Sequence, residues 1–299
     1  MIGALVQQLR VRQWTKNLVV FAGVVFSHHF HQLGELARAT QGFFAFCLLA
    51  SSVYVLNDIR DVERDRVHPK KRFRPIASGA ISMGWARLLV LLLLGAALAV
   101  AAPLGRGFLI VAGIYYGLNL AYSLALKQVV LLDVMIIAIG FVLRAVAGVE
   151  LLSAAEEISP WLLICTLFLA LFLAVAKRRA EVTLLAGHAA DHRATLDDYP
   201  LALVDQLVPI VTAATIIAYA IYTVSPQTVS KFGTDRLVYT VPFVVYGVFR
   251  YLYLVYRQGR GGSPSEVLLT DMPTLLNVLL WIVTVLLILG VGARLAPSP

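Results

Sequence analysis

Charged residues are scarce in this chain, and their scarcity excludes an ordinary soluble fold. Only 14% of the 299 residues are charged, whereas 60% are hydrophobic. A soluble globular domain averages about a quarter charged residues. Apolar runs close to the roughly 20 residues that cross a bilayer recur along the whole length. The chain is therefore predicted to be an integral membrane protein.

Cysteine is also rare, and two other patterns are missing. Cys47 and Cys165 both fall inside apolar runs, which predicts neither a disulfide nor a cysteine metal site. The barrel-like alternation of apolar and polar residues is absent, so helices are expected to form the spans. The start, MIGALVQQLRVRQWTKN, is a short amphipathic segment with charges, and no cleavable signal peptide is expected.

The apolar runs predict an all-α bundle that forms a single membrane-embedded domain over residues 1–299. No second soluble domain and no low-complexity segment is evident. The nine predicted spans are residues 15–32, 38–57, 84–103, 107–124, 129–150, 160–177, 203–224, 237–256 and 273–295.

The net charge of +8 indicates contact with anionic lipids rather than with nucleic acid. Most basic residues fall in the N-terminal segment and in the loops after the second, fourth, sixth and eighth spans. Because positive loops stay on the cytoplasmic side, the N-terminus and these loops are predicted to be cytoplasmic. The protein is expected in the plasma membrane, with its polar face toward soluble metabolites.

An acidic motif, NDIRDVERD, follows the second predicted span. Its residues Asn57, Asp58, Asp61 and Asp65 are spaced 1, 3 and 4 apart. At about 100° per residue they fall within an arc of about 100° on a helix. Oxygen ligands of this kind suit Mg²⁺, which completes its coordination with waters and substrate phosphates. The motif predicts a magnesium site, although most charged runs are simply solvated.

A basic stretch follows the acidic motif directly. Lys70, Lys71, Arg72 and Arg74 lie within the same loop. Carboxylates that hold a metal, next to Lys and Arg that hold phosphate oxygens, are the pairing that a metal–diphosphate requires. The positive-inside rule also accounts for some of these residues.

Further candidates for binding an anionic substrate lie at the predicted cytoplasmic ends of other spans. They are Lys16 and Asn17 in WTKN, Tyr122 and Lys127 in YSLALK, Lys177, Arg178 and Glu181 in AVAKRRAE, and Tyr199 in LDDYP. Interfacial anchoring, snorkelling and complementing of a helix dipole explain the cations equally well. Arg144 lies deep in the fifth span, where a cation is costly and indicates either function or an internal pair. HHFH at 28–31 is interpreted as an interfacial cluster and not as a metal site.

Taken together, these motifs resemble the UbiA superfamily of intramembrane transferases over essentially the whole chain. RVRQWTKN, HPKKRFRPIASG, YSLALK, GFVLRAVAG and AVAKRRAE are similar to one branch of it, the decaprenyl-phosphate phosphoribosyltransferases. Ordinary members carry a second aspartate-rich motif after the sixth span. Here KRRAE stands there, and the adjacent Asp197 and Asp198 do not follow a helical spacing. This departure suggests a second bound phosphate instead of a second metal.

The resemblance implies an Mg²⁺-dependent transfer of 5-phosphoribose from phosphoribosyl diphosphate to a polyprenyl phosphate, for cell-wall arabinan precursors. Asn57, Asp58, Asp61 and Asp65 would hold the metal, and Lys71, Arg72 and Arg74 would bind the donor. One alternative is transfer of a prenyl group from a prenyl diphosphate to an aromatic or other acceptor. A second is a non-enzymatic transporter or lipid-binding protein, for which charges along a midplane path would be expected. The residues leave monomer and homo-oligomer equally open.

Overall fold

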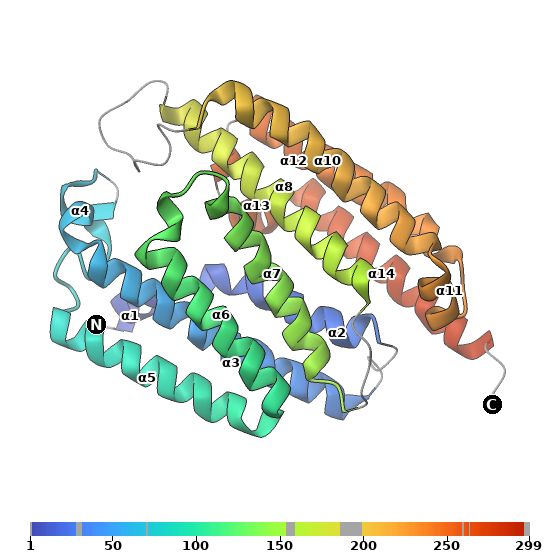
Figure 1. Ribbon diagram of the computed structural model, residues 1–299, viewed down its shortest axis with the longest axis horizontal. Helices are drawn as coiled ribbons and strands as arrows, with labels where there is room; N and C mark the ends of the chain where they lie inside the picture. The colour runs from blue at the N-terminus through green and yellow to red at the C-terminus, as the bar shows by residue number, and fades with distance from the viewer. Residues whose placement is uncertain are drawn as a thin grey trace. The chain divides into compact units, whose positions relative to one another are not determined.

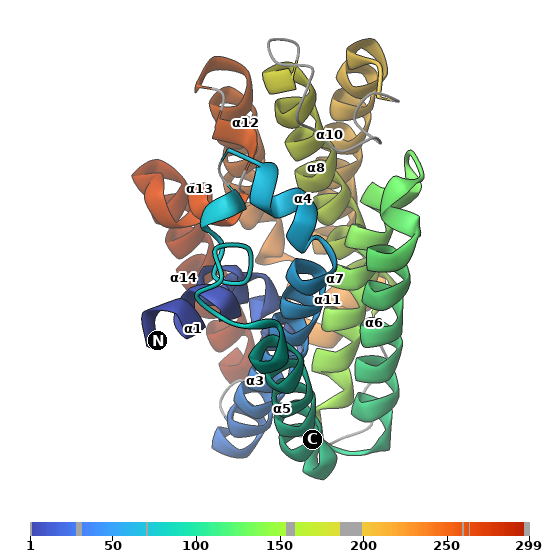
Figure 2. The same ribbon diagram turned by 90° about the vertical axis from the view of Figure 1, so that its left-hand side faces the viewer.

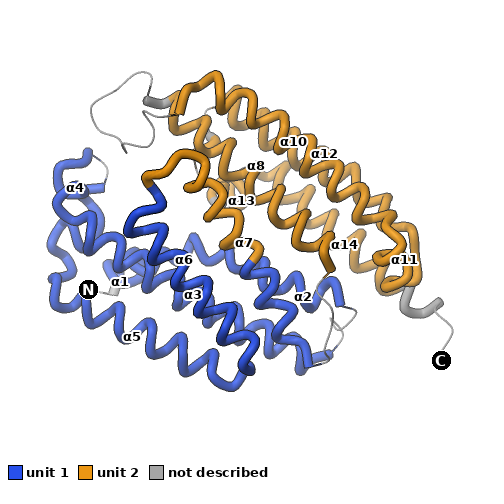
Figure 3. The backbone as a smooth tube through the Cα atoms, in the orientation of Figure 1, with its two compact units in different colours: residues 1–127, 143–157 blue, residues 128–142, 158–299 orange. Residues whose placement is uncertain are grey.

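The structure is a computed structural model that describes residues 2–27, 32–69, 71–153, 159–185, 199–258, 260–262 and 264–295. Within these ranges the regular elements are all helices. The chain divides into two compact units (Figure 3), here called unit 1 (residues 1–127 and 143–157) and unit 2 (residues 128–142 and 158–299). Helix α7 (Leu132–Glu150) contributes its first part to unit 2 and its second part to unit 1.

Long apolar helices confirm eight of the predicted spans. The candidate spans are Leu33–Arg60, Met83–Leu104, Arg106–Leu124, Leu132–Glu150, Pro160–Thr183, Leu201–Val224, Arg236–Gln258 and Met272–Gly290. Each overlaps a predicted run and differs from it by a few residues at the ends. The chain is thus an all-helical protein that passes the membrane several times.

The run predicted to form the first span, residues 15–32, folds differently. Helix α1 (Ile2–Leu9) ends just before Arg10, and a 3₁₀ helix, η1 (Val11–Phe21), leads into the short α2 (Ala22–Val25). At about 2.0 Å per residue, a 3₁₀ helix of this length rises about 22 Å. Residues 28–31, including HHFH, lie outside the described residues. The count of nine spans is therefore not confirmed.

Unit 1 is built around α3 (Leu33–Arg60). Helix α5 (Met83–Ala101) runs beside it, as both views show (Figures 1 and 2). The other elements are α4 (Val62–Val67), η3 (Lys71–Phe73), η4 (Ala102–Leu104), α6 (Arg106–Leu124) and η5 (Leu126–Gln128). Phe46, Phe108 and Leu151 are fully buried in one of its cores. Because lipid supplies no hydrophobic drive between helices, the close van der Waals packing of these large side chains holds the core together.

A second core of unit 1 fixes the N-terminal helix. Ala4, Leu5 and Leu9 of α1 pack against a cluster that includes Val55 and Ile76. This apolar face of α1 also carries the buried Gln8. Docking of α1 therefore brings a polar side chain to the end of α3, where the acidic motif lies.

Unit 2 pairs α8 (Pro160–Leu185) with α10 (Leu201–Val224) along their lengths. Its other elements are α11 (Pro226–Phe232), η6 (Arg236–Thr240), α12 (Val241–Gln258), η7 (Arg260–Gly262), α13 (Pro264–Thr270) and α14 (Met272–Leu295). Phe172 of α8 stacks edge-on against Tyr251 of α12, with ring centroids 5.6 Å apart. These aromatic rings lie in the main core of the unit.

Arg250 of α12 ties that helix to the start of α14. Its guanidinium donates to both carboxylate oxygens of Asp271, at 2.8 and 3.1 Å. Asp271 also accepts from the backbone and hydroxyl of Thr274, as a helix N-cap does. The hydrogen bonds from Arg250 hold the pKa of Asp271 well below its usual value. Arg250 thus serves as an internal ion-pair partner.

Candidate active site

The acidic motif lies where α3 ends and α4 begins. Asn57 and Asp58 are in the last turn of α3, Asp61 is at the junction, and Asp65 is in α4. Asp58 and Asp65 are each only 3% exposed, whereas Asp61 is half-buried. The helical turn breaks at Asp61, so the predicted single face is distributed over the end of the long α3 and the short α4.

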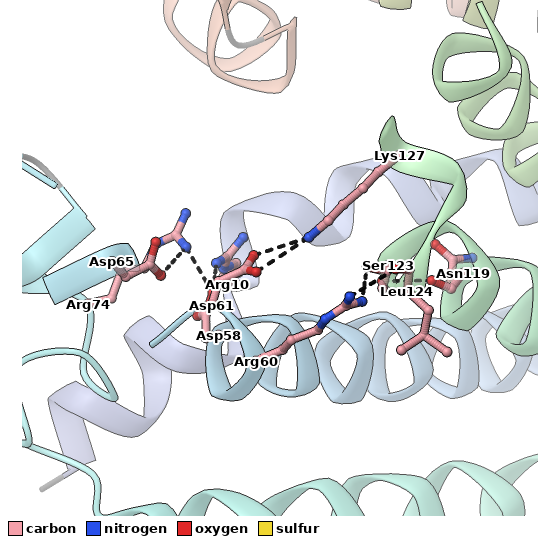
Figure 4. Close-up of polar contacts among 10 residues, drawn as sticks. All are labelled: Arg10, Asp58, Arg60, Asp61, Asp65, Arg74, Asn119, Ser123, Leu124 and Lys127. Atoms are coloured by element: carbon pink, nitrogen blue, oxygen red, sulfur yellow. Dashed lines mark hydrogen bonds and ion pairs between the residues drawn. The ribbon is translucent and has the colours of Figure 1, made fainter. Parts of the chain in front are cut away.

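Each carboxylate of the motif faces a cation (Figure 4). Arg10 Nη2 lies 2.6 Å from Asp58 Oδ1. Gln8 Nε2, which Figure 4 does not draw, donates to Asp58 Oδ2 at 2.9 Å. Arg74 Nη1 bridges Asp58 and Asp65, at 3.0 and 2.6 Å. Lys127 Nζ approaches Asp61 at 3.4 Å. In this arrangement the acidic charge is balanced by cations from three different segments.

A tight turn after α4 positions Arg74. Its carbonyl accepts from the backbone N–H of Ser78 at 2.9 Å, and the following Ile76 is buried. Gly79 completes the turn with a φ of 79°, which glycine adopts without strain. Lys71 and Arg72 are exposed, and Arg72 stacks on the ring of Phe73. Of these residues, Arg74 contacts the acidic motif directly, through Asp58 and Asp65.

Arg60 holds the end of α6 and thereby helps to position Lys127, which follows a few residues later. Its guanidinium donates to the carbonyls of Ser123 and Leu124, the last residues of α6 (Figure 4). These carbonyls have no partner within their own helix, and a cation there also complements the helix dipole. The end of α6 is thereby held against α3, and Lys127 follows in η5. Tyr122 is half-buried in the same last turn of α6 and directly precedes Ser123, whose carbonyl accepts from Arg60.

The donor chemistry of the motif suits a hard cation, and two of its carboxylates, those of Asp58 and Asp65, meet at the Nη1 atom of Arg74. Among the described residues, no group of three or more His, Cys, Asp or Glu is arranged to hold a metal ion. Gln8 Oε1, however, is buried beside Asp58 with no hydrogen-bond partner in the described part of the chain. An unused oxygen next to carboxylates is compatible with a hydrated cation. Asn57, Asp58, Asp61 and Asp65 remain the residues that would hold it.

A second polar cluster surrounds the deep Arg144 in unit 1. Arg144 is 6% exposed, and its Nε donates to Asn17 Oδ1 at 2.7 Å. Its Nη2 donates to the Tyr115 hydroxyl at 2.7 Å, and the guanidinium lies over the same ring. Asn17 in turn donates to Cys47 Sγ at 3.2 Å. The two sequence candidates Asn17 and Arg144 are therefore bonded to each other, while Lys16 beside them is half-buried.

In unit 2, the cations after the sixth predicted span are mostly held by carboxylates. Arg178 bonds Asp133 and Glu181, both at 2.5 Å, and Asp133 is fully buried. Arg179 bonds Asp205 at 2.6 Å. Lys177 lies 3.6 Å from Glu181 but keeps 43% of its side chain exposed. Within KRRAE, Lys177 is therefore the cation most accessible to a ligand.

Tyr199 joins the same network. Its hydroxyl donates to Asp133 Oδ1 at 2.6 Å and accepts from the backbone N–H of Leu131 at 2.7 Å. Burial raises the pKa of Tyr199, and the hydrogen bond to Asp133 raises it further. Tyr199 therefore stays protonated and acts as a fixed donor. Lys70, Asp197 and Asp198 lie outside the described residues.

The sequence patterns do not predict several residues of these networks, among them Gln8, Arg10 and Asp133. Gln8 lies on the apolar face of an amphipathic segment. A polar residue on a face that becomes buried is a local sign of a polar contact there. Arg10 stands in a basic N-terminal segment that the positive-inside rule already explains, so it gives no further local signal. Asp133 begins a long apolar run, and a carboxylate at that position is itself unusual.

Comparisons with known proteins agree with the fold and with the family resemblance. The model of the UbiA prenyltransferase family matches residues 18–266. Decaprenyl-phosphate phosphoribosyltransferase of Mycolicibacterium smegmatis is 33% identical, over 95% of this chain and 92% of that protein. The protein of the same name from Corynebacterium glutamicum is 34% identical, over 93% of this chain and 84% of that protein.

A solved structure shares the arrangement of helices. A UbiA homolog from Archaeoglobus fulgidus bound to GPP and Mg²⁺ superposes with a TM-score of 0.71 at 19% identity, covering 96% of this chain and 99% of that one. At this identity the likeness concerns the fold. The match to the family model covers most of the chain, and the two curated relatives cover nearly all of it. This chain therefore belongs to the UbiA prenyltransferase family of membrane transferases.

Proposed function

We propose that this transferase moves 5-phosphoribose from phosphoribosyl diphosphate to a polyprenyl phosphate such as decaprenyl phosphate. The observation that carries the proposal is the likeness, over more than nine-tenths of the chain, to relatives named decaprenyl-phosphate phosphoribosyltransferase. The basic KRRAE in place of a second acidic motif supports it, because a phosphate acceptor brings a second anion to the site.

The donor would bind at the acidic motif. Asn57, Asp58, Asp61 and Asp65 would hold Mg²⁺, which neutralises the charge that develops on the departing diphosphate. Arg74 and Lys127 already lie against these carboxylates and would bind phosphate oxygens of the donor. Lys71 and Arg72 are exposed on the same loop and remain candidates for the donor's outer phosphate.

The acceptor needs no general base. A polyprenyl phosphate is anionic near neutral pH, and one of its oxygens would attack C1 of the ribose. The C1–O bond to diphosphate breaks as the new bond forms, and the electron pair leaves with the diphosphate. A cation-like state at C1 is expected, as in glycoside chemistry, and direct displacement inverts the anomeric centre.

The accessible Lys177 is the strongest candidate in unit 2 for the acceptor or the ribose 5-phosphate. Lys16 and Tyr122 stay candidates in unit 1. Internal bonds engage Arg144 in unit 1 and Arg178, Glu181 and Tyr199 in unit 2, so each of them would contribute by holding the shape of its own unit. The active site would face the cytoplasm from the plasma membrane, and the product would supply cell-wall arabinan synthesis.

The test uses full-length protein in detergent with Mg²⁺, decaprenyl phosphate and labelled phosphoribosyl diphosphate. Label is expected in the organic phase, with the mass of a lipid-linked phosphoribose. EDTA and Asp58→Asn should each lower the rate by more than about 100-fold, because the leaving-group charge is no longer neutralised. Glu63→Gln is the matched control, since Glu63 lies in the same segment and is 79% exposed.

The outcome that overturns the proposal is also specific. The family's description and the GPP-bound homolog favour prenyl transfer as the competing activity. Turnover of a prenyl diphosphate with an aromatic acceptor, and no lipid-linked phosphoribose, would assign this chain to that activity. It would also mean that KRRAE does not mark a phosphate acceptor.

A further inference from the structure

Gln8 has a buried polar atom at the acidic motif that makes no hydrogen bond to the described residues. The side chain is 1% exposed, and its Nε2 donates to Asp58 Oδ2. Its Oε1 has no partner within the described ranges. A buried acceptor without a donor costs free energy, so such atoms usually have a partner in the functional state. The free oxygen belongs to the same amide group that contacts Asp58.

Arg10, two residues further on, has an unusual backbone. Its φ of 52° and ψ of 47° place it in the left-handed region, where residues other than glycine are uncommon. Strain of this kind persists only where the surroundings hold it, and it is frequent at functional sites. Here the holding contacts are the ion pair with Asp58 and the ring of Tyr54, 5.0 Å from the guanidinium carbon.

We propose that Gln8 and Arg10 complete the metal–diphosphate site, an inference that rests on the proposed function. Gln8 Oε1 accepts a hydrogen bond from a water of the bound cation. Arg10 is the counter-ion of Asp58 before the cation binds, and it turns to a phosphate oxygen once the cation and diphosphate are bound. A divalent cation at Asp58 repels the guanidinium, and a diphosphate attracts it.

This role gives Arg10 opposite effects on two affinities. Without diphosphate, Arg10 competes with the cation for Asp58, so its removal strengthens Mg²⁺ binding. With diphosphate present, Arg10 is a ligand, so its removal weakens diphosphate binding. A residue with a merely structural role would shift both affinities in the same direction or neither of them.

The test is calorimetric titration of the full-length protein in detergent, first with Mg²⁺ alone and then with inorganic diphosphate at saturating Mg²⁺. Arg10→Gln should lower the Kd for Mg²⁺ several-fold and raise the Kd for diphosphate about tenfold. Arg12→Gln is the matched control, because Arg12 is exposed on the same segment and carries the same charge. Equal shifts in both variants, or weaker binding of both ligands in Arg10→Gln, would overturn the role of Arg10.

Gln8 is tested with its exposed neighbour Gln7 as the control. Gln8→Met keeps the length of the side chain and removes the oxygen, so Mg²⁺ should bind several-fold more weakly, whereas Gln7→Met should bind as the wild type. Gln8→Glu adds a carboxylate and should bind Mg²⁺ more tightly. Unchanged Mg²⁺ affinity in both folded Gln8 variants would refute the role of Gln8.

These probes also separate the two proposals. Mg²⁺ and inorganic diphosphate contain neither ribose nor lipid, and both phosphoribosyl and prenyl transfer release diphosphate. The opposite shifts in Arg10→Gln can therefore appear even if lipid-linked phosphoribose is never formed. Conversely, the protein could form lipid-linked phosphoribose while its Arg10 and Gln8 variants bind Mg²⁺ and diphosphate as the wild type does. That result would support the proposed function and refute this inference.

Discussion

Arg178 and Asp133 form a buried ion pair with side chains only 6% and 0% exposed. Transfer of both charges out of water is costly, and their mutual attraction offsets that cost only if the geometry is good and other hydrogen bonds are made. Tyr199 and Glu181 supply such bonds. The pair is therefore structural. If either residue is removed, the other is left as a buried, unpaired charge.

Arg178→Met should lower the free energy of unfolding by about 3–5 kcal/mol, because Asp133 is then a buried, uncompensated carboxylate. Arg178→Met combined with Asp133→Leu should recover part of this loss. Unfolding in detergent by chemical denaturant measures both effects. If the double variant is as unstable as the single one, the contribution of Arg178 to stability does not come from its ion pair with Asp133. If it folds and transfers at the wild-type rate, Arg178 does not bind a phosphate.

The residues of the candidate site that sequence could identify are those with local signals. Asp58, Asp61 and Asp65 share a spacing, and Arg74 follows them in one loop. Gln8 and Arg10 contact Asp58 across 50 and 48 positions, and Arg178 meets Asp133 across 45. Such pairings depend on which helices dock together, which a single chain without aligned relatives does not reveal.

At the scale of helices, a close crossing joins the N-terminal segment to α7. A Cβ atom at Gly148 would lie 2.1 Å from the carbonyl oxygen of Val20, and one at Gly23 would lie 2.2 Å from that of Gly148. Small residues let helices in membranes approach until their backbones touch, which replaces the missing hydrophobic drive with close packing. Arg144 lies one turn before Gly148 on α7, so this contact also helps place Arg144 against Asn17.

Gly148→Ala should destabilise unit 1 by about 1–3 kcal/mol, since the added methyl group would overlap backbone that has to shift. Gly113→Ala, in α6, has nothing within 4 Å of the new Cβ and should be neutral or slightly stabilising. Thermal unfolding of the two variants in the same detergent compares them directly. Equal stability of Gly148→Ala and wild type would mean that the crossing is looser than the structure indicates.

For the whole molecule, hydropathy predicted eight spans well because each requires only length and apolar composition. The run at 15–32 is also apolar, but residues 11–21 wind as a 3₁₀ helix, because apolar composition does not specify winding; the ninth span stays a prediction. Trp14, Asn17 and the glycine at position 23 are individually compatible with a membrane helix. In the structure these residues make contacts with α3 and α7, which are distant in sequence and which local propensity does not reveal. The orientation of the bundle also rests on loop charge alone and stays a prediction.

Cysteine labelling tests the orientation. In a background with Cys47→Ser and Cys165→Ala, Ala80→Cys should react with a membrane-impermeant reagent only from the cytoplasmic side, because its loop is strongly basic. Asp235→Cys should react only from the outside. Both positions are exposed. Labelling in intact cells and in inverted vesicles distinguishes the two sides, and the reverse pattern would place the acidic motif outside the cell.

The 3₁₀ winding of η1 sets a register against α3. Three residues of a 3₁₀ helix rise about 6 Å, and four residues of an α-helix also rise about 6 Å. Trp14 bonds Ser51, and three residues later Asn17 bonds Cys47, four residues back along α3. Between these two bonds, the antiparallel helices η1 and α3 therefore cover the same axial distance of about 6 Å. Deletion of a single residue between Trp14 and Asn17 would put these two bonds out of step with each other.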